Sequence, residues 1–207
     1  MPQVRAEQTR SRIIETAARA FADHGYDGVS LNDLIAATGM SKGAFYFHFA
    51  SKDEVALAAF RAKQEELIEH LFGAERGSSA VAEVKEILRR RAQLVTDDVS
   101  LRCVIRLGSD LGARSGPGSE YASFQELAVA VVADLIRRGV ASREFRRGLD
   151  PEGTARAVFA WVVGMDSLSL LESDGKDVVD RTEEMLGLLI PALSAAGQAG
   201  RSRQRRP

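Results

Sequence analysis

Apolar residues recur at every third or fourth position through most of the chain, which is the period of an amphipathic α-helix. The first segment shows this pattern well, because Ile13, Ala17 and Phe21 fall on one face while Arg12 and Arg19 fall elsewhere. The strict alternation of apolar and polar residues that marks a half-buried strand is weak throughout. The pattern therefore predicts an all-α protein.

Nine helices are expected, several of them ending at glycine or proline. They lie at about Ile13–Ala22, Leu31–Gly39, Lys42–Phe49, Ser51–Gly73, Ala80–Thr96, Leu101–Leu111, Glu120–Arg138, Pro151–Glu172 and Val178–Leu189. The second helix has the clearest start, since Ser30 and Asp33 have the spacing of a capping box. Asp150 and Pro151 mark the eighth start as N-cap and first helical residue.

The second and third helices are separated only by the turn Gly39-Met40-Ser41, which gives each arm about eight residues. Two short helices joined by a tight glycine turn form the helix-turn-helix that places its second helix in the major groove of DNA. Three parts of the chain are therefore expected: a helix-turn-helix domain over residues 1–50, a larger helical domain over 51–199, and a basic disordered tail over 200–207.

The residue types of the third helix suit contact with DNA. Lys42 lies at its start, where side chains meet base edges, while Gly43 and Ala44 allow a close backbone approach. Tyr46 and His48 can donate hydrogen bonds to phosphate, and residues at helix N-termini lie where phosphate is attracted. The expected DNA contacts are Ser30, Ser41, Lys42, Gly43, Ala44, Tyr46, His48 and Lys52.

A packing role for the same segment stays open at this point. The aromatic run from Phe45 to Phe49 also suits a protein core, and Phe45 and Phe49 are expected to anchor the third helix. Charge does not decide between the two, because residues 1–50 hold five basic and five acidic residues. The alternative function is an all-α small-molecule-binding protein or enzyme that uses the helix-turn-helix only for packing.

Composition excludes several classes of protein. The chain has 28 Lys and Arg against 29 Asp and Glu, so a general polycation is disfavoured. One cysteine allows no internal disulfide, and no run of about 18 apolar residues predicts a membrane span. No metal, cofactor or membrane contact is expected, no catalytic constellation is evident, and the cytoplasm is the expected location.

The segment from Thr9 to Lys52, above all Gly39-Met-Ser-Lys-Gly-Ala-Phe-Tyr-Phe-His-Phe-Ala-Ser-Lys52, closely resembles the N-terminal domain of TetR-family regulators. Within that family it is most similar to γ-butyrolactone autoregulator receptors. Gly139, Phe145, Asp150, Pro151 and Gly164 extend the resemblance into the second part of the chain. The resemblance implies a homodimer, a ligand pocket in each C-terminal domain, and release of a repressor from a pseudo-palindromic operator by a small apolar effector.

Butyrolactone receptors typically carry a tryptophan in the pocket, and Phe124 stands at that place here. The effector is therefore left open between a γ-butyrolactone type and an antibiotic-like molecule, as in pseudo-receptors. Apolar positions converging from several helices, with Gln64 as a polar anchor, give the expected ligand-binding set: Phe124, Trp161, Met165, Leu107, Leu127 and Gln64. The last two helices usually form the subunit interface in this family, and their apolar positions are Val158, Val162, Leu186, Leu189 and Ile190.

Overall fold

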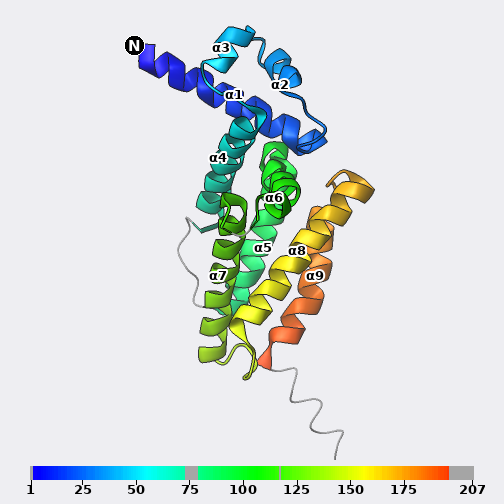
Figure 1. Cartoon of the computed structure of the whole chain (residues 1–207). Helices are drawn as coiled ribbons and strands as arrows, with labels where there is room; N and C mark the ends of the chain where they lie inside the picture. The colour runs from blue at the N-terminus through cyan, green and yellow to red at the C-terminus, as the bar shows by residue number, and fades with distance from the viewer. Residues whose placement is uncertain (1, 73–78, 117, 196–207) are drawn as a thin grey trace, which may run out of the picture. The chain divides into compact units, whose positions relative to one another are not determined.

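The computed structural model describes residues 2–72, 79–116 and 118–195, and within these ranges the chain forms nine α-helices, one short 3-10 helix and no strand (Figure 1). The helices are α1 Pro2–His24, α2 Leu31–Thr38, α3 Lys42–Tyr46, α4 Lys52–Phe72, α5 Ala80–Asp97, η1 Val99–Leu101, α6 Arg102–Ser115, α7 Glu120–Ala141, α8 Pro151–Ser173 and α9 Val178–Leu193. The all-α prediction is confirmed. The expected basic tail at 200–207 lies outside the described residues.

Helix ends follow the capping chemistry of the sequence. Ser30 and Asp33 form both bonds of the capping box, and Gly39 ends α2 in the left-handed conformation with φ of 68°. Asp150 caps α8 by accepting a hydrogen bond from the backbone of Gly153 at 3.1 Å. These starts and stops depend on neighbouring residues alone, and so they could be predicted.

Several helices differ from the expected bounds. Helix α1 begins at Pro2 instead of about Ile13, and α6 ends at Ser115 instead of about Leu111. Helix α3 ends at Tyr46 instead of Phe49, because Phe47 is its C-cap and the chain turns before Ser51 starts α4. Helix α9 continues past Pro191 to Leu193. A proline near a C-terminus removes only one hydrogen bond, and the backbone of Ser194 still donates to the carbonyl of Ile190 at 2.9 Å.

The described chain divides into two compact units. The first unit contains the described residues up to His70 together with Asp97–Ser123, and the second contains those of Leu71–Thr96 and from Phe124 onward. In the first unit, α1 contacts α2, α6 and η1. Its core is formed by buried side chains of α1, α2, α3, α4 and α6, including Phe21, Leu34, Phe45, Phe60 and Leu107.

The second unit joins α5, α8 and α9 through packing and ion pairs. Arg91 of α5 contacts the buried carboxylate of Asp166 on α8, with Nη1 3.0 Å from Oδ1. Arg89 pairs with Glu183 of α9 at 2.5 Å, and Arg90 pairs with Glu86 at 2.9 Å. The run of three arginines therefore contributes to the structure of this unit.

Helix α8 has the length and composition of a membrane-spanning helix, with a mean hydropathy of 1.2, which the apolar-run criterion of the sequence analysis did not flag. The helix packs on α9, and its Asp166 is buried against Arg91. A carboxylate held by an arginine of the neighbouring helix is typical of the core of a helical domain, and a core helix satisfies the same length test.

Gly139 near the end of α7 shows why one glycine of the C-terminal pattern is required. A Cβ atom at this position would overlap the ring of Phe145, which is fully buried. The same turn is closed by a hydrogen bond from the backbone of Phe145 to the carbonyl of Gly139 at 2.9 Å. The glycine therefore allows the chain after α7 to fold back onto the helix.

Replacing Gly139 by alanine is expected to destabilise the protein by about 1–3 kcal/mol, the usual cost of overpacking a core. The thermal unfolding midpoint should fall by several degrees. Gly108→Ala is the matched control, since its Cβ would meet Phe60 at an ordinary 3.8 Å and alanine favours the helix. Equal midpoints for the two variants would contradict the overlap argument.

Candidate nucleic-acid interface and ligand cleft

A few buried side chains hold helices α2 and α3 against the rest of the first unit, and the remaining surface of the two helices faces solvent. Leu34, Ile35 and Phe45 are buried. The hydroxyl of Ser30 accepts from the backbone of Asp33 at 3.1 Å, and that of Ser41 accepts from the backbone of Ala44 at 3.3 Å. Both serines thus fix the starts of the helices while remaining exposed.

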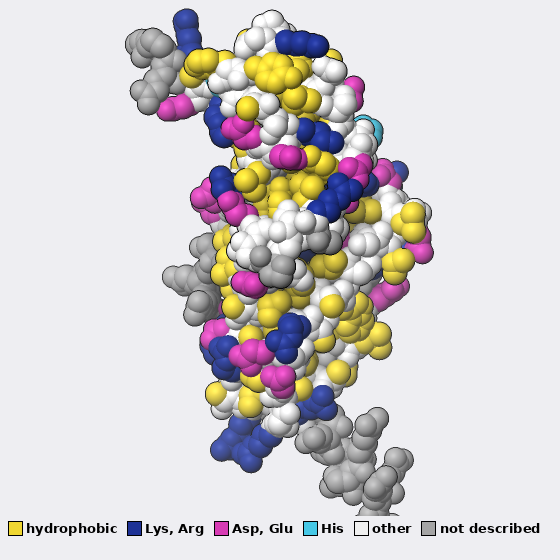
Figure 2. Space-filling model, viewed as in Figure 1, with side chains coloured by type: hydrophobic (Ala, Val, Ile, Leu, Met, Phe, Trp, Pro, Cys, Tyr) yellow, Lys and Arg dark blue, Asp and Glu magenta, His cyan; other side chains and the backbone are white. Residues whose placement is uncertain are grey.

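The outer surface of α3 brings most of the expected DNA contacts together. Lys42, Gly43, Ala44 and Tyr46 are all exposed, and His48 is half-buried beside them. A Cβ on Gly43 would meet no atom within 4 Å, so the backbone there is open to a partner. Figure 2 shows hydrophobic and basic side chains side by side over the region of α2 and α3.

Phe47 is a member of this surface that the sequence analysis did not assign. Its side chain is 80% exposed, whereas Phe45 and Phe49 on either side are buried. The sequence pattern could have predicted this exposure. Phe45 and Phe49 are four residues apart and share one side of a helical turn, so the residue midway between them lies on the opposite side. The guanidinium of Arg10 lies 4.6 Å from the ring centroid of Phe49 and adds a cation beside the end of α3.

Lys52 has a different place from the one expected. Its ammonium donates to the carbonyls of Tyr26 at 3.0 Å and Val29 at 2.9 Å, and it lies 3.8 Å from the centroid of the Tyr26 ring. Two of its three donors are therefore committed to the loop between α1 and α2. Lys52 therefore holds the loop in place, a role that the sequence did not indicate, and its contact with phosphate stays a prediction.

The loop between α1 and α2 is tied to both α4 and α6. The backbone of Tyr26 donates to Asp110 of α6 at 2.8 Å, and its hydroxyl donates to Asp53 of α4. Burial, together with the Asp53 carboxylate, raises the pKa of Tyr26 to about 12. Arg114 of α6 pairs with Asp27 at 2.6 Å. Any displacement of α4 or α6 would therefore move this loop.

Lys63 of α4 forms a second connection within the first unit. Its buried ammonium lies 2.7 Å from Glu15 of α1, 2.9 Å from Glu66 and 3.9 Å from Asp98. Burial alone would raise the pKa of Glu15, but the hydrogen bond and charge of Lys63 hold it below its usual value. A single cation thus links α1, α4 and the residue that caps η1.

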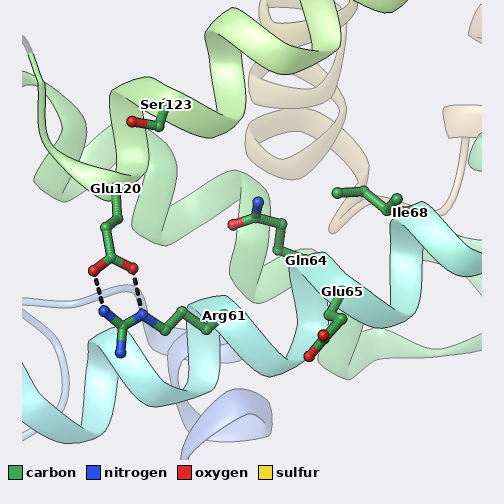
Figure 3. Close-up of a pocket in the computed structure, with 6 residues that line it drawn as sticks. All are labelled: Arg61, Gln64, Glu65, Ile68, Glu120 and Ser123. Carbon is green, nitrogen blue, oxygen red and sulfur yellow. Dashed lines mark hydrogen bonds and ion pairs between the residues drawn. The ribbon is translucent and has the colours of Figure 1, made fainter.

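A cleft of about 440 Å³ lies between α4 and the first turn of α7, and its lining residues are Arg61, Gln64, Glu65, Ile68, Glu120 and Ser123 (Figure 3). Arg61 donates two hydrogen bonds to the carboxylate of Glu120. The bond and charge of Arg61 lower the pKa of Glu120. Figure 3 shows the amide of Gln64 directed into the space between the two helices.

The six expected ligand residues fall in both units. Gln64, in the cleft, and the buried Leu107 belong to the first unit, and the other four belong to the second. Met165 is buried near Thr182 of α9, with Sδ 4.0 Å from Oγ1, and Phe124 is half-buried. Leu127 and Trp161 are exposed. Gln64 is the member of the set that lines the cleft.

The expected interface residues on α8 and α9 occupy the interior of the subunit. Val158, Val162, Leu186 and Leu189 are buried within a single chain, and Ile190 is half-buried. Residues packed against their own chain have little surface left for a partner, and the place of these side chains in a subunit interface stays a prediction. The periodic pattern marked the buried stripe of each helix without showing what covers it.

The exposed side of α8 carries another apolar stripe that includes Trp161, Gly164, Leu168 and Leu171, the last of them 82% exposed. Leu188 on α9 is 67% exposed. A Cβ on Gly164 would meet no atom within 4 Å, so this glycine leaves open space on the helix surface. The stripe has the composition of a surface that another helix covers.

Among the described residues, no group of three or more His, Cys, Asp or Glu side chains is placed to hold a metal ion. Cys103 is buried, and burial raises the pKa of its thiol to about 12.

Residues 13–59 match the model of bacterial regulatory proteins of the tetR family. The chain is 25% identical to the A-factor receptor protein of Streptomyces griseus over 94% of its own length and 67% of that protein. It is 28% identical to the HTH-type transcriptional regulator TtgR of Pseudomonas putida over 92% of its own length and 95% of that protein.

Solved structures of transcription regulators also resemble this chain. A structure reported as "Molecular basis for control of antibiotic production by a bacterial hormones" matches with a TM-score of 0.73 and 29% identity, covering 91% of this chain and 98% of that one. The crystal structure of a γ-butyrolactone receptor, an ArpA-like protein, matches with a TM-score of 0.65 and 26% identity, covering 88% of this chain and 99% of the other.

Proposed function

Since the chain belongs to the TetR family of bacterial regulatory proteins, we propose that it is a repressor that leaves its operator when a small molecule binds. Members of this family are DNA-binding transcription regulators and not enzymes. The observation that carries the proposal is the exposed outer surface of α3, which follows a tight glycine turn and begins with a lysine. We place the protein in the cytoplasm, where it meets its operator.

The surface of α3 suits the major groove. Lys42 lies at the helix start and can reach a base edge, while Gly43 and Ala44 bring the backbone close. Tyr46 is 50% exposed and can donate its hydroxyl to a phosphate. A helix-turn-helix used only for packing would bury this surface, so its exposure favours DNA binding over the packing alternative.

We propose that two subunits meet through the exposed stripe of α8 and Leu188 of α9. The open glycine at position 164 allows a partner helix to approach closely, and Trp161 supplies a large apolar contact area. Two subunits place two α3 helices on successive half-sites of a pseudo-palindromic operator. Trp161 is thus reassigned from the ligand site to the subunit contact.

We propose that the effector enters the cleft beside α4. The relatives named as an A-factor receptor and a γ-butyrolactone receptor point to a lactone with an apolar chain. Gln64 can donate an amide hydrogen to a lactone carbonyl, and Ile68 offers apolar surface to the chain. Leu107 of the first unit and Phe124, Leu127 and Met165 of the second stay predicted ligand residues of their own units. An antibiotic-like molecule of the same character remains a candidate effector.

Movement of α4 would connect ligand binding in the cleft with the release of DNA. The cleft residues Arg61 and Gln64 flank Lys63, which is bonded to α1, and the same helix begins with Lys52 and Asp53, which hold the loop before α2. A ligand that shifts α4 therefore moves α2 and α3. A coupling free energy of about 1–3 kcal/mol would weaken operator binding roughly 5–150-fold.

Substitutions on α3 test the DNA contact. Lys42→Ala is expected to weaken binding to the DNA upstream of the protein's own gene by about 1–3 kcal/mol if it meets a base. Tyr46→Phe should weaken binding to operator DNA and to unrelated DNA alike, by about 0.5–1.5 kcal/mol, which is the free energy of one hydrogen bond. Titrations at fixed salt measure both, with the exposed Lys176→Ala as a charge-matched control. Unchanged affinity in both α3 variants would remove this helix from the interface.

A charge placed on the α8 stripe tests the dimer. Leu168→Glu and Leu171→Glu are expected to give monomers at micromolar concentration, because a carboxylate buried in an apolar interface lacks a partner. Sedimentation equilibrium gives the mass. Val4→Glu, at an exposed apolar position of α1, should leave the dimer intact. A dimeric mass for both stripe variants would place the interface elsewhere.

An acylated γ-butyrolactone with a six-carbon chain is the first probe for the effector. It is expected to release labelled operator DNA from the wild type, and Gln64→Leu should require about 2–10-fold more lactone, since one hydrogen bond is lost. Glu69→Gln, an exposed position of the same helix outside the cleft lining, is the control, and Phe124→Ala and Trp161→Phe are titrated in parallel. Equal release from the wild type, Gln64→Leu and Phe124→Ala would show that the lactone binds elsewhere.

A further inference from the structure

Phe47 is displayed on a rigid base at the end of α3. Its backbone donates to the carbonyl of Gly43 at 3.1 Å, and the buried rings of Phe45 and Phe49 fix the chain on both sides. The ring stacks edge-on against His48 with centroids 5.2 Å apart. An 80% exposed ring that is held by its neighbours presents a defined apolar surface to solvent.

The surroundings of this ring are cationic and polar. Lys42 and Tyr46 are exposed on the same short helix, and the guanidinium of Arg10 covers the neighbouring Phe49 ring. Such a surface attracts a polyanion, but a phenylalanine has no donor for phosphate. In the major groove of DNA, the apolar group on a base edge is the 5-methyl group of thymine.

We propose that Phe47 determines sequence specificity by packing its ring against the 5-methyl group of one thymine in each operator half-site. The inference rests on the proposed DNA binding of α3 and adds to it a base and a chemical group. Lys42 and Phe47 are five residues apart, which is about 7.5 Å along a helix. The thymine therefore lies roughly two base pairs from the base that Lys42 meets.

The experiment removes the methyl group without changing any hydrogen bond. Duplexes are first selected by the wild-type protein from a random library, and each thymine of the selected sequence is then replaced by uracil, one position at a time. At one thymine in each half-site the wild type should lose about fourfold in affinity, which corresponds to one buried methyl group. Replacement in both half-sites together should cost more than tenfold.

Variants of Phe47 then assign the effect to the ring. Phe47→Ala should weaken binding to the thymine duplex and bind the thymine and uracil duplexes equally at that position. Phe47→Leu should keep part of the preference, because leucine is apolar and reaches outward. Tyr46→Phe is the matched control. It should weaken binding to all duplexes alike, and the affinity lost at each uracil replacement should stay as in the wild type. Thermal unfolding midpoints should be unchanged, as the ring is outside the core.

Two results overturn the inference while leaving DNA binding in place. One is a wild type that binds its selected duplex with no loss at any uracil. The other is a Phe47→Ala protein that binds every duplex more weakly but loses the same affinity as the wild type at each uracil replacement, since Phe47 would then contact the DNA backbone. A wild type that enriches no sequence at all overturns the proposed function, and this inference with it.

Discussion

The hydrogen bonds of Tyr26 hold the loop that precedes α2 and α3, the two helices proposed to meet DNA. Helices α2 and α3 have eight and five residues, and helices this short are not stable alone in water. Their orientation therefore depends on what holds the loop before them. Tyr26 bonds to Asp110 of α6 and to Asp53 and Lys52 of α4, so two helices of the first unit's core fix the loop.

This constraint also supports the proposed coupling between the cleft and the surface of α3. Helix α4 supplies Arg61, Gln64 and Ile68 to the cleft and, at its other end, Lys52 and Asp53 to the loop. A helix transmits a displacement along its length because its backbone hydrogen bonds make it stiff. The Arg61–Glu120 pair across the cleft is exposed, and exposed pairs contribute little free energy, so a ligand could separate it at small cost.

Local chemistry made much of the fold predictable from sequence. The Ser30–Asp33 box, the Gly39 stop and the Asp150 cap each depend on residues within a few positions, and the structure has all three. The end of α3 was not predictable in the same way, because the aromatic run continues the helical pattern while the chain turns toward Ser51. The role of Lys52 was missed because its partners, Tyr26 and Val29, are distant in sequence.

The apolar stripes of α8 and α9 show a second limit of periodicity. An apolar stripe is buried whether its own chain or another chain covers it, so the sequence does not tell whether Val158 and Leu186 pack within the chain or against a partner. The structure separates the two cases by exposure: both are buried inside one subunit, whereas Leu168 and Leu171 are exposed. Gly164 is exposed, and a Cβ atom there would meet no atom within 4 Å, so the open space beside it is on the outside of α8.

The balanced charge of residues 1–50 is compatible with DNA binding because several of its acids are occupied. Glu15 is bonded to Lys63, Asp27 to Arg114, and the Asp33 carboxylate accepts a hydrogen bond from the backbone of Ser30. Lys42 remains exposed on the surface of α3. Attraction to unrelated DNA scales with the number of phosphates neutralised and carries no sequence preference. In the proposed binding mode, discrimination comes from contacts of α3 with base edges, and these depend on the orientation that Tyr26 and its partners maintain.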